Sequence, residues 1–237
     1  MRVCLLAFLL YLGFLPFSSA QFGLRAKYNN QSFSSWDNSI FNANSNENQI
    51  FDTGYEVGLD YWFRLKKRRV EFMPEIAYST SKSTLNGLHN IDNITLTGYY
   101  FNFNTHIYAL DMEGDCDCPT FSKQGPSINK GLFFHFTPGL GYVTSNTKSI
   151  NNATVQSDDV NSIIFRAGIG IGLDIGINDL ITITPIVSYY FHSGIPWENI
   201  PTAEATLVNA TANPKNLQFT LRVGFRPDYT KGKRRRR

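Results

Sequence analysis

The sequence predicts an all-β protein, an eight-stranded antiparallel up-and-down transmembrane β-barrel with long extracellular loops. Three observations predict it. Segments with a period of two recur about eight times, an apolar leader precedes them, and long polar connections alternate with mostly shorter ones. Successive side chains of a strand point to opposite faces, so this period marks one apolar and one polar face. A closed barrel with apolar residues outside and polar residues inside satisfies all its backbone groups within a membrane.

The segment 215–225 shows the alternation most clearly. One face carries Leu217, Phe219, Leu221, Val223 and Phe225. The other face carries Gln218, Thr220, Arg222 and Gly224. We expect the apolar set to face lipid and the polar set to face the barrel interior.

Seven further segments repeat this pattern, and we expect strands at about 22–29, 54–65, 69–79, 94–109, 131–144, 161–176 and 180–191. Each alternates, and examples of the expected outward residues are, in order, Leu24, Leu59, Ile76, Phe101, Phe134, Ile169 and Val187. The alternation of the fourth segment slips near Gly98, which predicts a bulge there. Three prolines inside the runs, Pro74, Pro138 and Pro185, predict further irregularities because proline cannot donate to a ladder.

The first twenty residues have the features of a secretory signal peptide. Met1-Arg2 is basic, Cys4 to Phe17 is almost wholly apolar, and Ser18-Ser19-Ala20 offers small residues for cleavage. An apolar run of about 14 residues is too short for a spanning helix, which needs about 20. We therefore expect three parts: a signal peptide at 1–20 cleaved after Ala20, a barrel at 21–226 and a basic periplasmic tail at 227–237.

Composition agrees with a barrel and argues against a helical membrane protein. Hydrophobic residues make up 42% of the chain and aromatic residues 14%. A bundle of membrane helices needs a more apolar chain, whereas an alternating barrel needs only half of each strand to be apolar.

The charges within the strands are expected to point inward as one network. An arginine on the lipid face at mid-bilayer costs roughly 2–4 kcal/mol, so two outward arginines would cost a large share of the protein's net stability. The expected lumen network contains five bases and five acids: Arg25, Lys27, Arg64, Arg166 and Arg222 with Glu56, Asp60, Glu71, Glu75 and Asp174. An eight-stranded barrel is just wide enough for side chains, so we expect a closed lumen. A narrow ion path is the alternative.

The connections predict which side of the membrane each end faces. The outer loops are expected at 30–53, 80–93, 145–160 and 192–214, and they carry more acids than bases. The inner connections, 66–69, 110–130 and 177–179, and the tail are strongly basic. A periplasmic tail meets no nucleic acid. It is either a solvated segment near anionic lipid or a docking site for an acidic periplasmic or outer-membrane protein partner.

The inner connection 110–130 is too long for a simple turn and contains Cys116 and Cys118 among alternating acids. Three interpretations stay open: a calcium loop, a soft-metal or redox pair, and a local disulfide or two unreactive thiols that stiffen a partner contact. The calcium loop lacks the glycine and glutamate of an EF-hand, since Cys116 and Ser122 occupy those positions. We expect no metal and no cofactor.

Two rival classes compete with a non-enzymatic barrel. His192, Ser193, Glu198 and Glu204 contain the residue types of an acyl-transfer site near the outer rim, as in a lipid A-modifying enzyme. These residue types are common in such loops, so we expect no enzyme. A soluble lipocalin-like barrel would place the ten charges on the outside, with the apolar groups in the interior.

With its leader, its two-faced strands and its terminal Leu-Gln-Phe-Thr-Leu-Arg-Val-Gly-Phe, the chain resembles the OmpA/OmpX-type outer-membrane barrels of Bacteroidota. The resemblance implies location in a Gram-negative outer membrane, contact with its lipids and insertion by the barrel-assembly machinery. It also implies a structural or interaction role at the cell surface, such as adhesion or partner docking. Small barrels of a type IX-like secretion or gliding apparatus are an alternative within this resemblance. The chain departs from the pattern by continuing about 12 residues past Phe225.

Overall fold

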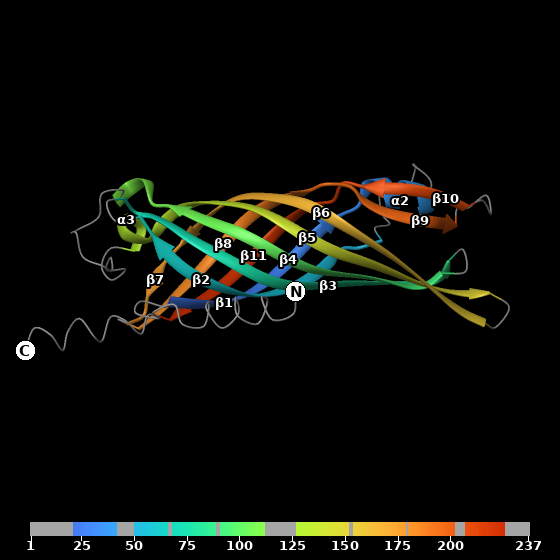
Figure 1. Cartoon of the computed structure of the whole chain (residues 1–237), viewed down its shortest axis with the longest axis horizontal. Helices are drawn as coiled ribbons and strands as arrows, with labels where there is room; N and C mark the ends of the chain where they lie inside the picture. Colours follow the sequence, from blue (N-terminus) through green and yellow to red (C-terminus); the bar gives the residue numbers. More distant parts are fainter. Residues whose placement is uncertain are drawn as a thin grey trace, which may run out of the picture.

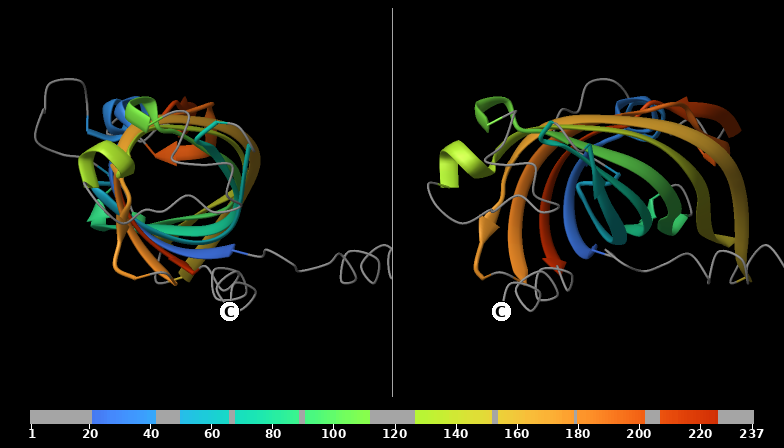
Figure 2. Two further views of the ribbon diagram at one scale, coloured as in Figure 1. Left: turned by 90° about the vertical axis from the view of Figure 1, so that its left-hand side faces the viewer. Right: turned by 60° about the vertical axis from the view of Figure 1, so that its left-hand side comes forward.

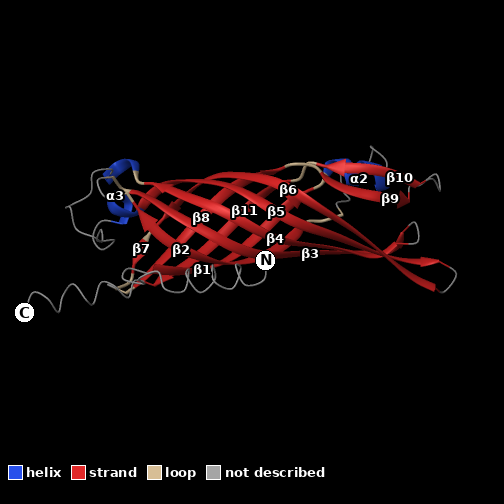
Figure 3. Ribbon diagram, viewed as in Figure 1, coloured by secondary structure: helices blue, strands red, loops and turns tan. Residues whose placement is uncertain are grey.

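The computed structural model describes residues 21–41, 50–65, 68–88, 91–111, 127–151, 154–178, 180–201 and 207–225. Within these ranges the chain forms a closed barrel with small elements at both ends (Figure 1). The expected signal peptide and basic tail lie outside the described residues. Strands account for most of the described chain, and the helices are short (Figure 3).

Eight long strands build the wall, and each pairs antiparallel with the next. They are β1 (Gln21–Ser32), β2 (Thr53–Arg64), β3 (Val70–Leu88), β4 (Ile91–Ile107), β5 (Leu132–Asn151), β6 (Thr154–Leu173), β8 (Ile181–His192) and β11 (Lys215–Phe225). β11 pairs with both β8 and β1, which closes the sheet (Figure 2). The predicted up-and-down barrel is therefore confirmed.

The prolines do not create the bulges that the sequence predicts. Pro74 pairs with Phe103, Pro138 with Ala167 and Pro185 with Leu221. Pairing with the strand on the other side lapses at each proline, but the register is the same before and after. β7 (Ile175–Gly176) is the continuation of β6 past such a lapse. A missing N–H thus removes pairing on one side without inserting a residue.

The predicted bulge at Gly98 is also wrong. Gly98 pairs with Ser79 and Val143 in an unbroken register. The apparent slip has another cause: Ile94 and Leu96 point inward and are buried. Apolar side chains on the inner face of this end of β4 reverse the expected polarity, while the register with β3 and β5 stays constant from Asn93 past Gly98 and shifts only between Ile91 and Asn93.

Two of the expected outer loops are mostly strand. β3 and β4 continue through 80–93 to a connection at 89–90, and β5 and β6 continue through 145–160 to a connection at 152–153. These four strands extend beyond the rest of the wall, since β2 pairs with β3 only up to Ser81 and β8 pairs with β6 only from Arg166. We call this extension, β3 to β6 beyond Tyr78 and Tyr99, the protruding sheet.

The other two outer connections contain small elements that cover the barrel mouth. One carries α2 (Ser34–Phe41), and the other carries the paired strands β9 (Ile195–Pro201) and β10 (Leu207–Ala212). They lie together at the end opposite η1 (Ala109–Asp111), α3 (Ser127–Gly131) and β7 (Figure 1). None of the described helices is both long and apolar enough to cross a bilayer.

The outward side chains form a continuous apolar wall. Ile163 is 81% exposed, Ile76 72% and Leu59 66%. The strands alternate between exposed and buried positions, as in β1 and β11. Along most of the wall the apolar set therefore faces away from the barrel interior and the polar set fills it, whereas the inward residues near the outer end, such as Ile94 and Leu96, are apolar.

Candidate functional site: the filled lumen

The polar faces of all eight strands converge on the interior of the barrel. Nine of the ten charged residues singled out in the sequence are buried there, and Arg64 is half-buried. The nine are Arg25, Lys27, Glu56, Asp60, Glu71, Glu75, Arg166, Asp174 and Arg222. Alternation places them inside, and the barrel's narrow bore brings them into contact.

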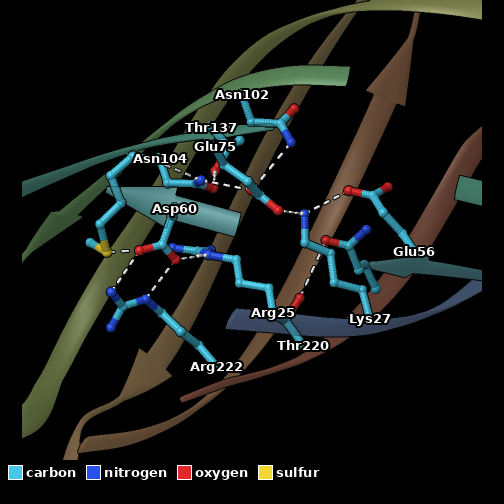
Figure 4. Close-up of polar contacts among 12 residues, drawn as sticks. Arg25, Lys27, Glu56, Asp60, Glu75, Asn102, Asn104, Thr137, Thr220 and Arg222 are labelled. Carbon is cyan, nitrogen blue, oxygen red and sulfur yellow. Dashed lines mark hydrogen bonds and ion pairs between the residues drawn. The ribbon is translucent and has the colours of Figure 1, made fainter. Parts of the chain in front are cut away.

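Asp60 is the centre of one ion-pair group (Figure 4). Arg25 donates from Nε to Asp60 Oδ2 at 2.7 Å. Arg222 donates from Nε to the same oxygen at 2.7 Å and from Nη2 to Oδ1 at 2.6 Å. Arg25 also contacts the sulfur of Met73 at 3.4 Å. Three strands, β1, β2 and β11, are thereby tied together through one carboxylate.

Glu56 is the centre of a second group. Arg166 donates from Nη1 and Nη2 to the two carboxylate oxygens at 2.8 and 2.7 Å. Lys27 lies between Glu56 and Glu75, with its Nζ 2.6 Å from an oxygen of each (Figure 4). The Arg166 guanidinium also stacks over the ring of Tyr100 at 3.7 Å. This group links β1, β2, β3 and β6 across the lumen.

Neutral side chains complete the hydrogen bonding of the charged groups. Arg166 Nε donates to Asn102 Oδ1 at 2.8 Å, and Asn102 and Asn104 both donate to Glu75 Oε2 at 3.2 and 2.8 Å. Thr137 donates to Asn104 at 3.0 Å. Buried ion pairs are stable only when their remaining donors and acceptors are satisfied, and these amides do so.

A third polar cluster lies at the end of the bore nearest η1. Trp62 and Tyr108 donate to Glu71 Oε2 at 2.7 and 2.9 Å. Tyr108 also hydrogen-bonds to Asp174. The guanidinium of Arg69 lies over the Tyr108 ring at 4.4 Å.

Arg69 corrects the expected charge balance. The sequence predicts Arg69 in the basic inner connection 66–69 and outside the lumen network, but it is fully buried in this cluster. Arg69 directly precedes β3, and the Tyr108 backbone N–H donates to the Arg69 carbonyl at 3.1 Å. The predicted five bases against five acids become six bases against five acids.

The opposite end of the bore is apolar. Ile94, Leu96, Val143 and Ile164 point inward beneath Trp36 and Trp197. The two tryptophan rings meet edge to face with centroids 5.2 Å apart, and Trp36 stacks on Phe33 at 4.9 Å. We call α2 with β9, β10 and the buried aromatics Phe33, Trp36, Phe51 and Trp197 the cap. The lumen therefore holds an apolar layer above a charged one.

One carboxylate helps to fold the cap. Asp37 Oδ1 accepts a hydrogen bond from the backbone N–H of Ile50 at 2.8 Å, which fixes the return of the chain towards β2. Partial burial raises the pKa of the Asp37 carboxyl above its ordinary value, although this hydrogen bond acts in the opposite direction.

Several lumen residues escaped the sequence analysis. Tyr100, Tyr108, His135 and Thr137 all fall on the inward parity of β4 and β5, or directly beyond it. His106 stacks on Phe133 at 3.8 Å and lies edge-on to His135 at 5.1 Å. The period of two was a usable signal for Tyr100, Tyr108, His135 and Thr137. No group of three or more histidine, cysteine or acidic residues that could hold a metal occurs in the described part of the chain.

The rim residues considered for acyl transfer contact backbone groups. Ser193 Oγ accepts a hydrogen bond from the Phe165 N–H at 2.8 Å, and its own N–H donates to the Phe165 carbonyl at 2.8 Å. The His192 ring lies 3.2 Å from the Pro214 carbonyl. Both residues thus extend the strand pairing at the rim. Glu204, Cys116 and Cys118 lie outside the described residues.

Fold and lumen together define a closed eight-stranded β-barrel whose bore is filled by its own side chains. No protein-family model matches the sequence. No curated protein matches it either.

Solved outer-membrane barrels are similar in structure. Neisserial surface protein A is 11% identical, with 86% of this chain and 96% of that chain covered and a TM-score of 0.45. Ail, the attachment invasion locus protein of Yersinia pestis, is 12% identical, with 87% and 98% covered and a TM-score of 0.44. OprG of Pseudomonas aeruginosa is 10% identical, with 88% and 96% covered and a TM-score of 0.43. Likenesses at this level establish neither a family nor an activity.

Proposed function

We propose that this chain is an integral outer-membrane barrel that does not conduct and that serves as a structural and interaction protein. The observation that carries the proposal is the filled bore inside an apolar wall. Residues such as Leu59, Ile76 and Ile163 form an exposed apolar surface. Contact of such a surface with water is unfavourable, whereas contact with lipid is favourable. Side chains from all eight strands occupy the space that a pore would need.

The lumen argues against a narrow ion path. Any ion crossing it must displace the pairs at Asp60 and Glu56, whose partners approach to 2.6–2.8 Å, and then the apolar layer beneath the cap. Breaking one buried ion pair costs about 3–5 kcal/mol. The charged layer and the apolar layer thus close the bore at two successive levels.

The protruding sheet supports the interaction role. On the side away from β5, no described strand pairs with β6 from Thr154 to Ile164. The Phe165 N–H and carbonyl both bond towards Ser193, so Ile163, Asn161 and Asp159, which share its parity, direct their backbone groups to that open edge. An open edge accepts an extended segment of a protein partner. Such a contact would serve adhesion or docking to a secretion apparatus.

The basic tail is a second proposed contact, for an acidic periplasmic or outer-membrane protein. It rests on the run Lys231 to Arg237 in the sequence, which lies outside the described residues. Deletion of 231–237 should remove co-purifying acidic partners from solubilised outer membranes. Unchanged co-purification would refute this contact without affecting the barrel.

Two measurements test the main proposal. The protein should fractionate with outer membranes and resist extraction by urea, since its apolar wall requires lipid. In planar bilayers it should give no stepwise conductance. Recovery in the soluble fraction would overturn the membrane assignment, and steady single-channel currents from the unaltered chain would overturn the closed lumen.

A further inference from the structure

The outward face of the protruding sheet changes chemistry abruptly along the strands. Tyr78, Tyr99, Tyr142 and Ile163 form the last row of the apolar wall, side by side across β3, β4, β5 and β6. Tyrosine is enriched where a membrane protein meets the membrane surface. The row therefore marks the outer boundary of the lipid-facing wall on this side of the barrel.

Three polar rows follow directly beyond the tyrosines. The first contains Thr80, Thr97, Thr144 and Asn161. The second contains Lys82, Thr95, Asn146 and Asp159. The third contains Thr84, Asn93 and Lys148. The inward residues of the same strands, such as Leu96 and Val143, are buried under the cap. The residues of the three rows point to the opposite face of the sheet and are accessible there. We call these three rows the polar face.

The height of the polar face indicates which kind of lipid headgroup surrounds it. Lys148 is six positions beyond Tyr142, which at about 3.4 Å per residue and a tilt of 35–45° places Lys148 roughly 15 Å above the tyrosine row. The polar headgroup layer of a phospholipid bilayer adds only about 5–8 Å on each side. The polar face is thus about twice as tall as a phospholipid headgroup, and it matches a lipid that carries sugars.

The chemistry of the polar face fits the same lipid. Threonine hydroxyls and asparagine amides both donate and accept hydrogen bonds, as sugar hydroxyls require. Lys82 and Lys148 are exposed and supply positive charge for phosphate groups. Asp159 accepts a hydrogen bond from Asn146 on the neighbouring strand, so part of its hydrogen-bonding capacity is used within the sheet. No comparable face exists along β8, β11, β1 and β2, whose described strands end at His192, Lys215, Ser32 and Thr53.

We propose that the polar face binds the phosphorylated sugar headgroups of glycolipids in the outer leaflet, on the β3–β6 side of the barrel only. The inference rests on the proposed membrane location and adds to it a defined lipid class and a defined side. Continuity supports it, because the acyl chains of the same lipid would lie along the apolar wall directly below the tyrosine row.

The test compares lipids in competition. The full chain is reconstituted into bilayers that contain lipopolysaccharide and phosphatidylglycerol at matched charge, and the lipids retained per barrel are counted after detergent extraction. The unaltered chain should retain lipopolysaccharide preferentially. The double variant Lys82→Gln, Lys148→Gln should lower this preference roughly 25-fold, since one lysine near an anionic surface contributes about a factor of five.

Matched controls separate the polar face from general charge. Lys215→Gln removes an exposed lysine at the outer end of β11, on the opposite wall, and should leave the preference unchanged. Thr97→Val with Thr144→Val keeps shape and charge but removes two hydroxyls, and it should lower the preference as well.

Three results would overturn the inference. They are an equal loss with Lys215→Gln, no loss with either double variant, and full competition by deacylated sugar phosphate, which would make the ligand a free sugar. If the chain enters bilayers but shows no preference for lipopolysaccharide, the headgroup inference fails alone. If the chain does not enter bilayers, the proposed function fails first.

Discussion

The guanidinium of Arg166 donates two parallel hydrogen bonds, of 2.7 and 2.8 Å, to the carboxylate of Glu56, although the two residues are 110 positions apart in the sequence. The pair crosses the bore from β6 to β2, and both side chains are almost completely buried. A two-pronged arginine–carboxylate contact fixes geometry as well as charge. This contact therefore sets the position of the charged layer within the barrel.

Replacement of Glu56 by glutamine should destabilise the barrel by about 3–5 kcal/mol, because Arg166 and Lys27 would keep their buried charges opposite a neutral amide. Urea unfolding in lipid vesicles measures the loss. Glu198→Gln makes the same change at an exposed position of β9 and should have little effect. Equal losses in the two variants would contradict the central place of Glu56.

Loss of the cap should not open the bore. Trp36→Ala with Trp197→Ala removes the edge-to-face pair above the apolar layer and should loosen α2 and the β9–β10 hairpin. The ion pairs around Asp60 and Glu56 lie deeper and remain, so single-channel recordings should stay silent. Currents from this variant would show that the charged layer leaves a path and that the cap alone seals the barrel.

Gly141 should be intolerant of a side chain. A Cβ there would lie 2.5 Å from the ring of Tyr100, which covers this glycine from the neighbouring strand and carries Arg166 on its face. Gly141→Ala should therefore cost about 1–3 kcal/mol through displacement of the ring. In a Tyr100→Ala background the same substitution should cost almost nothing. A cost that persists without the ring would locate the strain in the backbone.

The sequence allowed the barrel and its inward charges to be predicted because both follow from one period. Alternation in 215–225 separates Phe219 from Arg222 without knowledge of any partner strand. The pairing of particular charges was not predictable in the same way. Glu56 meets Arg166 only because closure and register place β2 and β6 across the same section of the bore, and these are properties of the whole sheet.

The protruding sheet and the cap escaped prediction because they reverse the rule. Beyond Gly98 the inward residues Ile94 and Leu96 are apolar and the outward residues Thr95 and Thr97 are polar. A prediction that requires apolar residues on the outer face therefore places a bulge at Gly98 and assigns 80–93 to a loop. The inward apolar residues meet Trp36 and Trp197, which come from two distant connections.

Asp37 should make the cap sensitive to pH. Its pKa is raised in the folded chain above the ordinary value of 3.8, so the folded cap holds the proton more tightly than the unfolded chain. The stability that this provides is complete below pH 3.8 and is lost as the pH rises through the folded pKa. Asp37→Asn keeps an acceptor for the Ile50 N–H and should abolish this loss. Tryptophan emission during urea titration at several pH values measures it, and identical pH profiles for both proteins would refute the assignment.

The open edge of β6 should be closed by a single proline. The Asn161 N–H points away from β5, so Asn161→Pro should leave the β5–β6 ladder paired while it removes a donor that a docking segment requires. Asn161→Thr is the matched control, since it also loses the hydrogen bond that Thr144 donates to Asn161 at 2.7 Å but retains the backbone donor.

Both variants should fold and insert into bilayers equally, as resistance to urea extraction reports. Only the proline variant should lose binding to cells or to a partner captured by the unaltered chain. Equal binding by the two variants would exclude the β6 edge as the docking site, and equal loss would assign the contact to the Asn161 side chain.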